Sequence, residues 1–115
     1  METTVVNIKV KYIRPEYQDL KEWCSDPNNV YIGRKRIVFI DGERYPKCDS
    51  LFANPYKGEN AIEKYRDYLL RSMKNGDITE EDVRSLRGKK LGCWCKPDRC
   101  HGDVILDVLK TLENN

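Results

Sequence analysis

The sequence predicts an α/β fold, in which residues 1–115 form a single small domain with a central mixed sheet and helices packed on its faces. Three observations favour this class. Strand-like patterns come early and are followed in order by helix, helix, strand and helix. The run from Leu91 to Cys95 carries no charge, which is typical of a strand inside a sheet. At 115 residues the chain is large enough for one modest core, and its 39% hydrophobic content favours a globular domain.

The first forty-five residues are expected to form strands around one short helix. Apolar residues at positions 6, 8, 10 and 12 alternate with polar ones, which predicts a first strand with one buried face. Pro15 is expected to open a short helix that Asp26-Pro27 ends. A second strand over residues 30–32 ends at Gly33-Arg34, and Asp41-Gly42 predicts a hairpin turn that follows a strand over residues 36–40.

Two helices are expected in the middle of the chain. Asn60 and Glu63 have capping-box spacing ahead of an apolar stripe, which predicts a helix running to about Lys74 and closed by Asn75-Gly76. Thr79 and Asp82 have the same spacing and start a shorter helix.

The C-terminal segment concentrates the reactive side chains. Three of the five cysteines and the only histidine lie between Cys93 and His101. After the strand over residues 91–95, Lys96-Pro97-Asp98 has turn chemistry, and apolar residues then recur at helical spacing. The segment Cys100–Asp103 is therefore expected at a helix N-terminus, where unpaired N–H groups and the helix dipole favour anions.

Composition excludes several classes of protein. The chain has 21 basic and 19 acidic residues, so its net charge of +2 does not indicate a nucleic-acid partner. The first residues lack the apolar run of a signal peptide, and no segment approaches the roughly 20 apolar residues of a membrane span. Five cysteines are an odd number, which favours reduced thiols and an intracellular, reducing location such as a cytoplasm or a virion. The oligomeric state stays open.

Four segments of the chain resemble one known family. They are Tyr31-Ile32-Gly33-Arg34, Ala53-Asn54-Pro55-Tyr56, the run Ala61–Leu69, and the run Gly88–Leu109 with its Cys-Trp-Cys-Lys-Pro and Cys-His-Gly-Asp pieces. They are similar to the family catalogued as domain of unknown function 4326, which occurs in bacteria, phages and large DNA viruses and has no established activity. The resemblance maps the family pattern onto Gly33, Arg34, Asn54, Pro55, Cys93, Cys95, Cys100, His101, Gly102 and Asp103.

One hypothesis for these residues is a pocket for a nucleotide-like or other anionic small molecule. Arg34 can grip a phosphate or carboxylate with two hydrogen bonds, and the loops of Gly33 and of Asn54-Pro55 are expected beside it. Candidate catalytic residues are Cys95, Cys100, His101 and Asp103. His101 can exchange a proton near neutral pH, and Asp103 can orient it or complement the helix dipole.

Two alternatives remain open at this point. Cys93, Cys95, Cys100 and His101 are residue types that zinc accepts, but a C-x-C-x4-C-H spacing differs from the usual two separated pairs, so no cofactor is favoured and zinc stays possible. The cysteines can equally be small buried residues that stabilise a non-catalytic phage or viral accessory or scaffold protein. Whether the protein is an enzyme is left open by the sequence.

Overall fold

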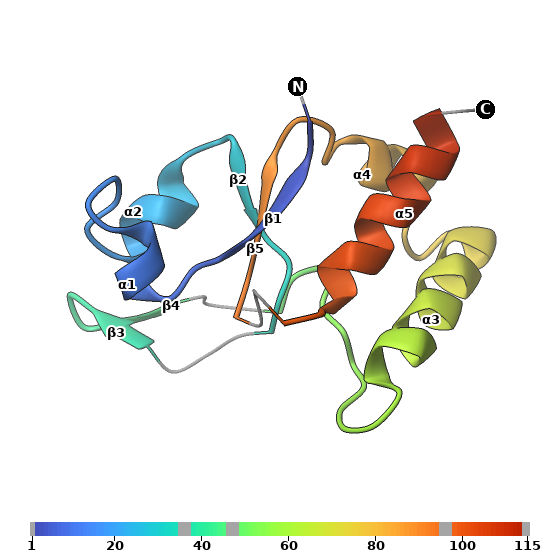
Figure 1. Ribbon diagram of the computed structural model, residues 1–115, viewed down its shortest axis with the longest axis horizontal. Helices are drawn as coiled ribbons and strands as arrows, with labels where there is room; N and C mark the ends of the chain where they lie inside the picture. Colours follow the sequence, from blue (N-terminus) through green and yellow to red (C-terminus); the bar gives the residue numbers. More distant parts are fainter. Residues whose placement is uncertain (1, 35–37, 46–48, 95–97, 114–115) are drawn as a thin grey trace.

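A parallel three-stranded sheet forms the centre of the structure (Figure 1). The computed structural model describes residues 2–34, 38–45, 49–94 and 98–113. Strands β1 (Thr4–Asn7), β2 (Asn29–Tyr31) and β5 (Lys90–Cys93) lie in the order β1-β5-β2. Leu91 of the central strand faces Val5 on one side and Val30 on the other, and both pairings are parallel. The α/β class is confirmed, and so is the interior position of the last strand.

A hairpin forms a separate two-stranded sheet. Strands β3 (Val38–Ile40) and β4 (Glu43–Tyr45) pair antiparallel, as the Asp41-Gly42 signal predicts. Asp41 and Gly42 have φ angles of 52° and 81°, the left-handed conformation that the tight turn of a two-residue hairpin requires. Parallel and antiparallel pairings therefore occur in two sheets rather than within one. The start of the predicted strand, at residues 36–37, lies outside the described residues.

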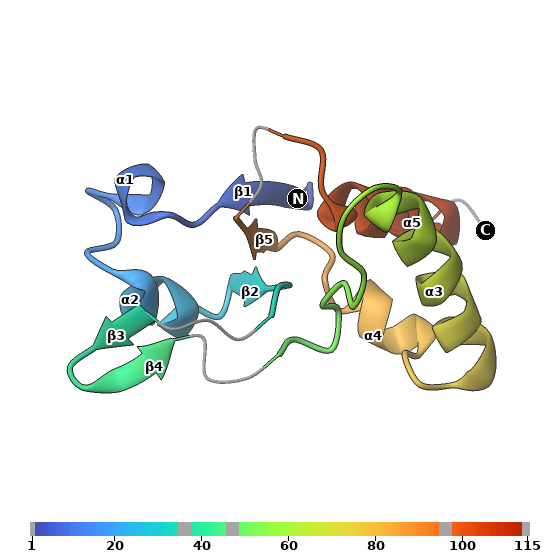
Figure 2. The ribbon, with the colours of Figure 1, turned by 90° about the horizontal axis from the view of Figure 1, so that it is seen from below.

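Five helices of the described chain lie on the two sides of the central sheet. They are α1 (Val10–Ile13), α2 (Leu20–Ser25), α3 (Ala61–Asn75), α4 (Glu80–Arg84) and α5 (His101–Glu113). Figure 2 shows α1, α2 and the hairpin on one side and α3, α4 and α5 on the other. Within the described ranges, no helix has the length and apolarity needed to cross a membrane.

Two apolar cores fill the two sides of the sheet. The larger core joins Leu91 and Ile32 to Tyr65 of α3 and Ile105 of α5, all of them without solvent exposure. The smaller core joins the sheet to α1 and α2 and centres on Trp23. Neighbouring residues of β1 serve both cores, because successive strand side chains point to opposite faces. Val5 packs against the larger core and Val6 against the smaller one.

The first strand is shorter than its alternating pattern predicts. It ends at Asn7, whose side-chain oxygen accepts a hydrogen bond from the N–H of Lys9 at 2.9 Å, and helix α1 begins at Val10. In the described residues, the register of β1 with β5 ends at Asn7 and Cys93. Val10 and Tyr12 are consequently exposed instead of alternating into a core, so this part of the prediction is wrong.

The helix starts follow their capping residues. Thr79 and Asp82 form the predicted capping box of α4. Helix α2 begins at Leu20 rather than near Pro15, because Asp19 caps it by accepting the N–H of Glu22. Helix α3 has the predicted extent, but Asn60 is left-handed, with a φ of 64°, and its side chain makes no capping hydrogen bond. The capping-box prediction at Asn60 is therefore wrong.

Two glycines allow the layers to approach closely. A Cβ atom at Gly92 would lie 2.4 Å from the ring of Trp23, and one at Gly102 would lie 2.9 Å from both methyl groups of Val5. Gly92 therefore admits Trp23 onto the central strand, and Gly102 lets the first turn of α5 rest on the sheet. Both distances are shorter than any ordinary carbon contact, so a larger side chain requires the layers to separate.

We expect Gly92→Ala to destabilise the protein by about 1–3 kcal/mol, because the added methyl group overpacks the core around Trp23. Urea unfolding followed by circular dichroism measures the change. Lys64→Ala, at an exposed position of α3, is the control and is expected to stay within about 0.5 kcal/mol of wild type. Equal stability of Gly92→Ala and wild type would contradict the packing described here.

Candidate functional site

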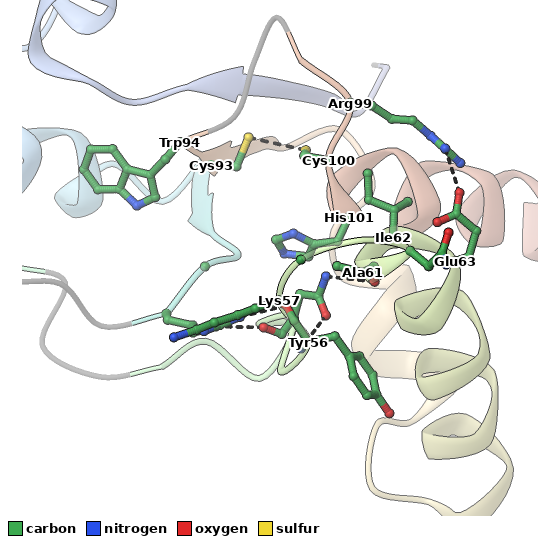
Figure 3. Close-up of a pocket in the computed structure, with 15 residues that line it drawn as sticks. Tyr56, Lys57, Ala61, Ile62, Glu63, Cys93, Trp94, Arg99, Cys100 and His101 are labelled. Carbon is green, nitrogen blue, oxygen red and sulfur yellow. Dashed lines mark hydrogen bonds and ion pairs between the residues drawn. The ribbon is translucent and has the colours of Figure 1, made fainter.

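A cleft of about 740 Å³ lies beyond the carboxyl ends of β2 and β5 (Figure 3). This is the usual ligand position in open α/β sheets, since loops and helix N-termini meet at that edge. Gly33 and Arg34 follow β2, Trp94 follows β5, and Cys100 and His101 open α5. Its lining residues are Gly33, Arg34, Asn54, Tyr56, Lys57, Gly58, Asn60, Ala61, Ile62, Glu63, Cys93, Trp94, Arg99, Cys100 and His101.

Arg34 fastens a distant loop to the end of β2. Its Nε donates to the carbonyl of Asn54 at 2.8 Å and its Nη2 to the carbonyl of Tyr56 at 2.9 Å. The two hydrogen bonds that we expected Arg34 to make to a ligand are thus made to backbone oxygens. The positive charge still lies at the cleft, where it acts on anything that enters.

Asn54 has a similar structural use. Its side-chain oxygen accepts the N–H of Tyr56 at 3.0 Å, and its side-chain nitrogen donates to the carbonyl of Ala61 at 3.2 Å. The carboxamide therefore shapes the loop and ties it to the start of α3. Pro55, the other residue expected in this loop, is exposed and is not among the cleft-lining residues.

His101 is buried on the inner side of the cleft, with 8% of its surface exposed. Its Nε2 lies 2.7 Å from the carbonyl oxygen of Ile32, and since a carbonyl only accepts, Nε2 carries the hydrogen of the neutral ring. The ring also meets Tyr65 edge-on at 4.9 Å. Burial, with a further contribution from the Arg34 charge, lowers the pKa of His101, while the Ile32 carbonyl and Asp103 oppose that shift.

Cys93 and Cys100 form a pair of thiols on the floor of the cleft. Their sulfur atoms lie 3.5 Å apart, and both residues are reduced and buried. The contact with Cys93, followed by burial, raises the pKa of the Cys100 thiol, so Cys100 retains its proton at neutral pH. Asp103 does not line the cleft; its carboxylate accepts the N–H of Cys100 at 3.1 Å and caps α5. Cys95 lies outside the described residues.

Among the described residues, three cationic side chains and one carboxylate line the cleft. Arg99 pairs with Glu63 at 2.8 Å across the cleft mouth, where both side chains are more than half exposed (Figure 3). Hydrogen bonding to its own backbone and to Arg99 lowers the pKa of Glu63. With Arg34 and Lys57 added, the lining carries more positive than negative charge.

The zinc alternative finds no support in the part of the chain that the structure describes. There, no three side chains of the His, Cys, Asp and Glu types are grouped to hold a metal ion. Cys100 faces Cys93, whereas the Nε2 of His101 is directed at a backbone carbonyl. A metal set that includes Cys95 falls outside the described residues.

The start of α3 lines the cleft, and the sequence interpretation did not include it. Lys57, Gly58 and Asn60–Glu63 form this wall, and Arg99 lies on the opposite side. The ring of Tyr56 packs edge-on against Tyr68 and is turned toward α3 (Figure 3). A sequence signal existed, because Asn54-Pro55 and Gly58 precede a helix start, but loop length alone does not say which sheet edge the loop reaches.

Comparison with known proteins agrees with the segments quoted above. The model of the family described as Domain of unknown function (DUF4326) matches residues 16–111. The chain belongs to this family. It is also 44% identical over 54 residues to an "Uncharacterized 12.4 kDa protein in nrdA-td intergenic region" of Enterobacteria phage T4. That alignment covers 47% of this chain and 50% of the phage protein, so it spans only half of each. No solved structure matches the chain.

In this DUF4326 chain, Arg34→Lys is expected to cost about 1–3 kcal/mol of stability, because a lysine has a single donor nitrogen where Arg34 uses Nε for one carbonyl and Nη2 for the other. Chemical denaturation measures the loss. Arg66→Lys is the matched control, since Arg66 makes an exposed ion pair with the side chain of Asp107. If both variants are equally stable, Arg34 does not hold the loop.

The stability of the protein is expected to fall as the pH drops below about 6.5, the ordinary pKa of histidine. Because the pKa of His101 is lowered in the folded protein, the unfolded chain binds a proton at a higher pH than the folded chain does. The contribution of His101 to the free energy of unfolding is therefore fully present above that pH. Below it, the free energy falls by no more than about 1.4 kcal/mol per pH unit.

Urea unfolding between pH 7.5 and 5.5 tests this expectation against His101→Gln, which keeps an N–H donor for Ile32. Because His101 is the only histidine in the chain, the difference between the two pH profiles reports this residue alone. Superimposable profiles would show that His101 titrates normally in the folded protein.

Proposed function

We propose that this protein binds a phosphate-bearing small molecule of the nucleotide class in the cleft beyond β2 and β5. One observation carries the proposal: the N-termini of two long helices and three cationic side chains line the same cleft. Helix N-termini attract anions through their unpaired N–H groups and the helix dipole. Arg34, Lys57 and Arg99 add full charges to this field.

The two helix N-termini differ in what already occupies them. In α5, the carboxylate of Asp103 reaches back to the N–H of Cys100, so an acidic side chain already fills the place of an anion. In α3, the carboxylate of Glu63 accepts a hydrogen bond from its own N–H, and the N–H of Ala61 donates to the carbonyl of Gly58. The side chain of Asn60, however, makes no capping hydrogen bond, and Ala61 and Ile62 line the cleft directly. The start of α3, close to Lys57, is therefore the better place for a phosphate group.

The size and the walls of the cleft suit a nucleotide. A volume of about 740 Å³ lies within the range of roughly 300–1,000 Å³ that is usual for small-molecule sites. Trp94 and Ile62 provide apolar surface beside the charged groups. Trp94 is held in place, since its Nε1 donates to the hydroxyl of Tyr31 at 2.9 Å. A rigid aromatic side chain of this kind can contact a base while the cations bind the phosphate.

Binding, rather than catalysis, is what the candidate reactive groups favour. Nε2 of His101 is hydrogen-bonded to the Ile32 carbonyl, and the carboxylate of Asp103 caps the N-terminus of α5. The raised pKa of Cys100 keeps it a thiol, which is a weak nucleophile. We therefore propose a binding site without assigning a reaction to it.

The test is a titration with inorganic phosphate, nucleosides and nucleoside mono-, di- and triphosphates, followed by thermal shift and calorimetry. A nucleotide is expected to raise the melting temperature, and its parent nucleoside to have a smaller effect. Lys57→Gln and Arg99→Gln are each expected to weaken nucleotide binding about tenfold, because each removes one charge-assisted contact.

Lys64→Gln is the matched control, since Lys64 is exposed on α3 and outside the cleft, and it should bind as wild type does. Arg34 is left intact, since its replacement releases the loop as well as the charge. Absence of a thermal shift with every compound, or binding indifferent to both cleft substitutions, would favour the non-catalytic scaffold alternative.

A further inference from the structure

Cys93 and Cys100 are brought together by elements that the fold holds firmly. Cys93 ends the central strand, and its carbonyl accepts the N–H of Ile8 at 3.0 Å. Cys100 directly precedes α5, where Asp103 binds its N–H and where Gly102 rests on Val5 of β1. The contact of 3.5 Å between the two sulfur atoms is therefore built from a strand end and a helix start.

The two sulfur atoms are close enough to form a disulfide after a small movement. A disulfide places its sulfur atoms about 2.05 Å apart, so the two thiols need only a small approach from 3.5 Å. Both residues belong to the lining of the cleft, although each exposes only 2% of its surface. The cleft is thus the route by which a small oxidant reaches them.

We propose that Cys93 and Cys100 are a redox-active pair. They form a reversible intramolecular disulfide by exchange with a low-molecular-weight disulfide such as glutathione disulfide. This inference does not depend on the nucleotide proposal. A buried cysteine by itself is an ordinary core residue. Two thiols in contact at the floor of an open cleft are instead placed for exchange chemistry.

The reaction proceeds in two displacements. The Cys93 thiol loses its proton to solvent, and its thiolate attacks one sulfur of glutathione disulfide, which forms a mixed disulfide and releases one glutathione thiolate. Cys100 then loses its proton to solvent, attacks the Cys93 sulfur and releases the second glutathione. Two protein S–H bonds are lost and one S–S bond is formed, so two electrons pass from the protein to glutathione disulfide.

The order of the two steps follows from the hydrogen bond between the thiols. The contact with Cys93 and burial raise the pKa of Cys100, because both disfavour its thiolate. A protonated Cys100 can donate to a Cys93 thiolate and stabilise it. With Cys100 as the donor of this contact, Cys93 is the attacking sulfur and Cys100 the resolving one.

A Cys93–Cys100 bond would also close the connection between β5 and α5 into a short loop. Cross-linking restricts the unfolded chain, so the oxidised protein is expected to melt several degrees above the reduced protein. The bond would join the two elements that carry the floor of the cleft.

The experiment uses the variant Cys24→Ser/Cys48→Ser/Cys95→Ser, in which Cys93 and Cys100 are the remaining thiols. After incubation with glutathione disulfide, both thiols are expected to disappear from a thiol titration. The intact mass should fall by two hydrogen atoms, the chain should stay monomeric on a non-reducing gel, and dithiothreitol should restore both thiols. On the same background, Cys100→Ser is expected to stop at the mixed disulfide and to lose the increase in melting temperature.

Wild type is oxidised in parallel, so that the test survives if the triple variant does not fold. Trypsin cuts after Arg99 and separates Cys100 from the peptide that holds both Cys93 and Cys95. The expected product is a cross-linked peptide pair that persists in Cys95→Ser and is lost in Cys93→Ser. Retention of both thiols, a bond confined to Cys93 and Cys95, or cross-linking only between chains would overturn the proposal.

Discussion

Strand β5 is hydrogen-bonded to a parallel neighbour along each edge, and the arrangement of the cleft follows from that position. Because all three strands run in one direction, the segments that leave β2 and β5 emerge at the same edge of the sheet. Helix α5 then returns from this edge and presses its first turn onto β1 through Gly102. The loop after β2, the thiol pair and the histidine are near one another for this reason.

Several polar side chains at and beside the cleft also hold the surrounding backbone in place through hydrogen bonds. Arg34 and Asn54 use their hydrogen bonds to shape the loop that leads to α3. His101 holds the end of β2 through the Ile32 carbonyl, and Asp103 caps α5. Substituting any of these residues alters the walls of the cleft together with its charge. Lys57 and Arg99 separate the two effects, because they are exposed residues at its rim.

Local patterns predicted the elements whose signals are complete within a few residues. The Asp41-Gly42 turn and the Thr79–Asp82 capping box need no distant partner, and both form as expected. The run from Leu91 to Cys95 predicted a central strand because an uncharged segment needs cover on both faces.

The errors lie where a local pattern depended on a neighbour. Val10 and Tyr12 continue the alternation of β1, but in the described residues the register of β1 with β5 ends at Asn7 and Cys93, and the chain turns into a helix. Asn60 has the spacing of a cap, but the loop that Asn54 and Arg34 tie down delivers it in a left-handed conformation. Pattern and propensity carry no information about either constraint.

The sequence by itself determined the α/β class, the order of most elements, the family, and several of the segments that line the cleft. These properties depend on the periodicity of apolar residues and on short motifs, which are local. Only the tertiary structure decided that Cys93 meets Cys100, that the Arg34 guanidinium binds backbone carbonyls, and that the start of α3 faces the same cleft. The physical reason is that packing of the helices against the sheet sets these contacts, and packing joins residues far apart in the chain.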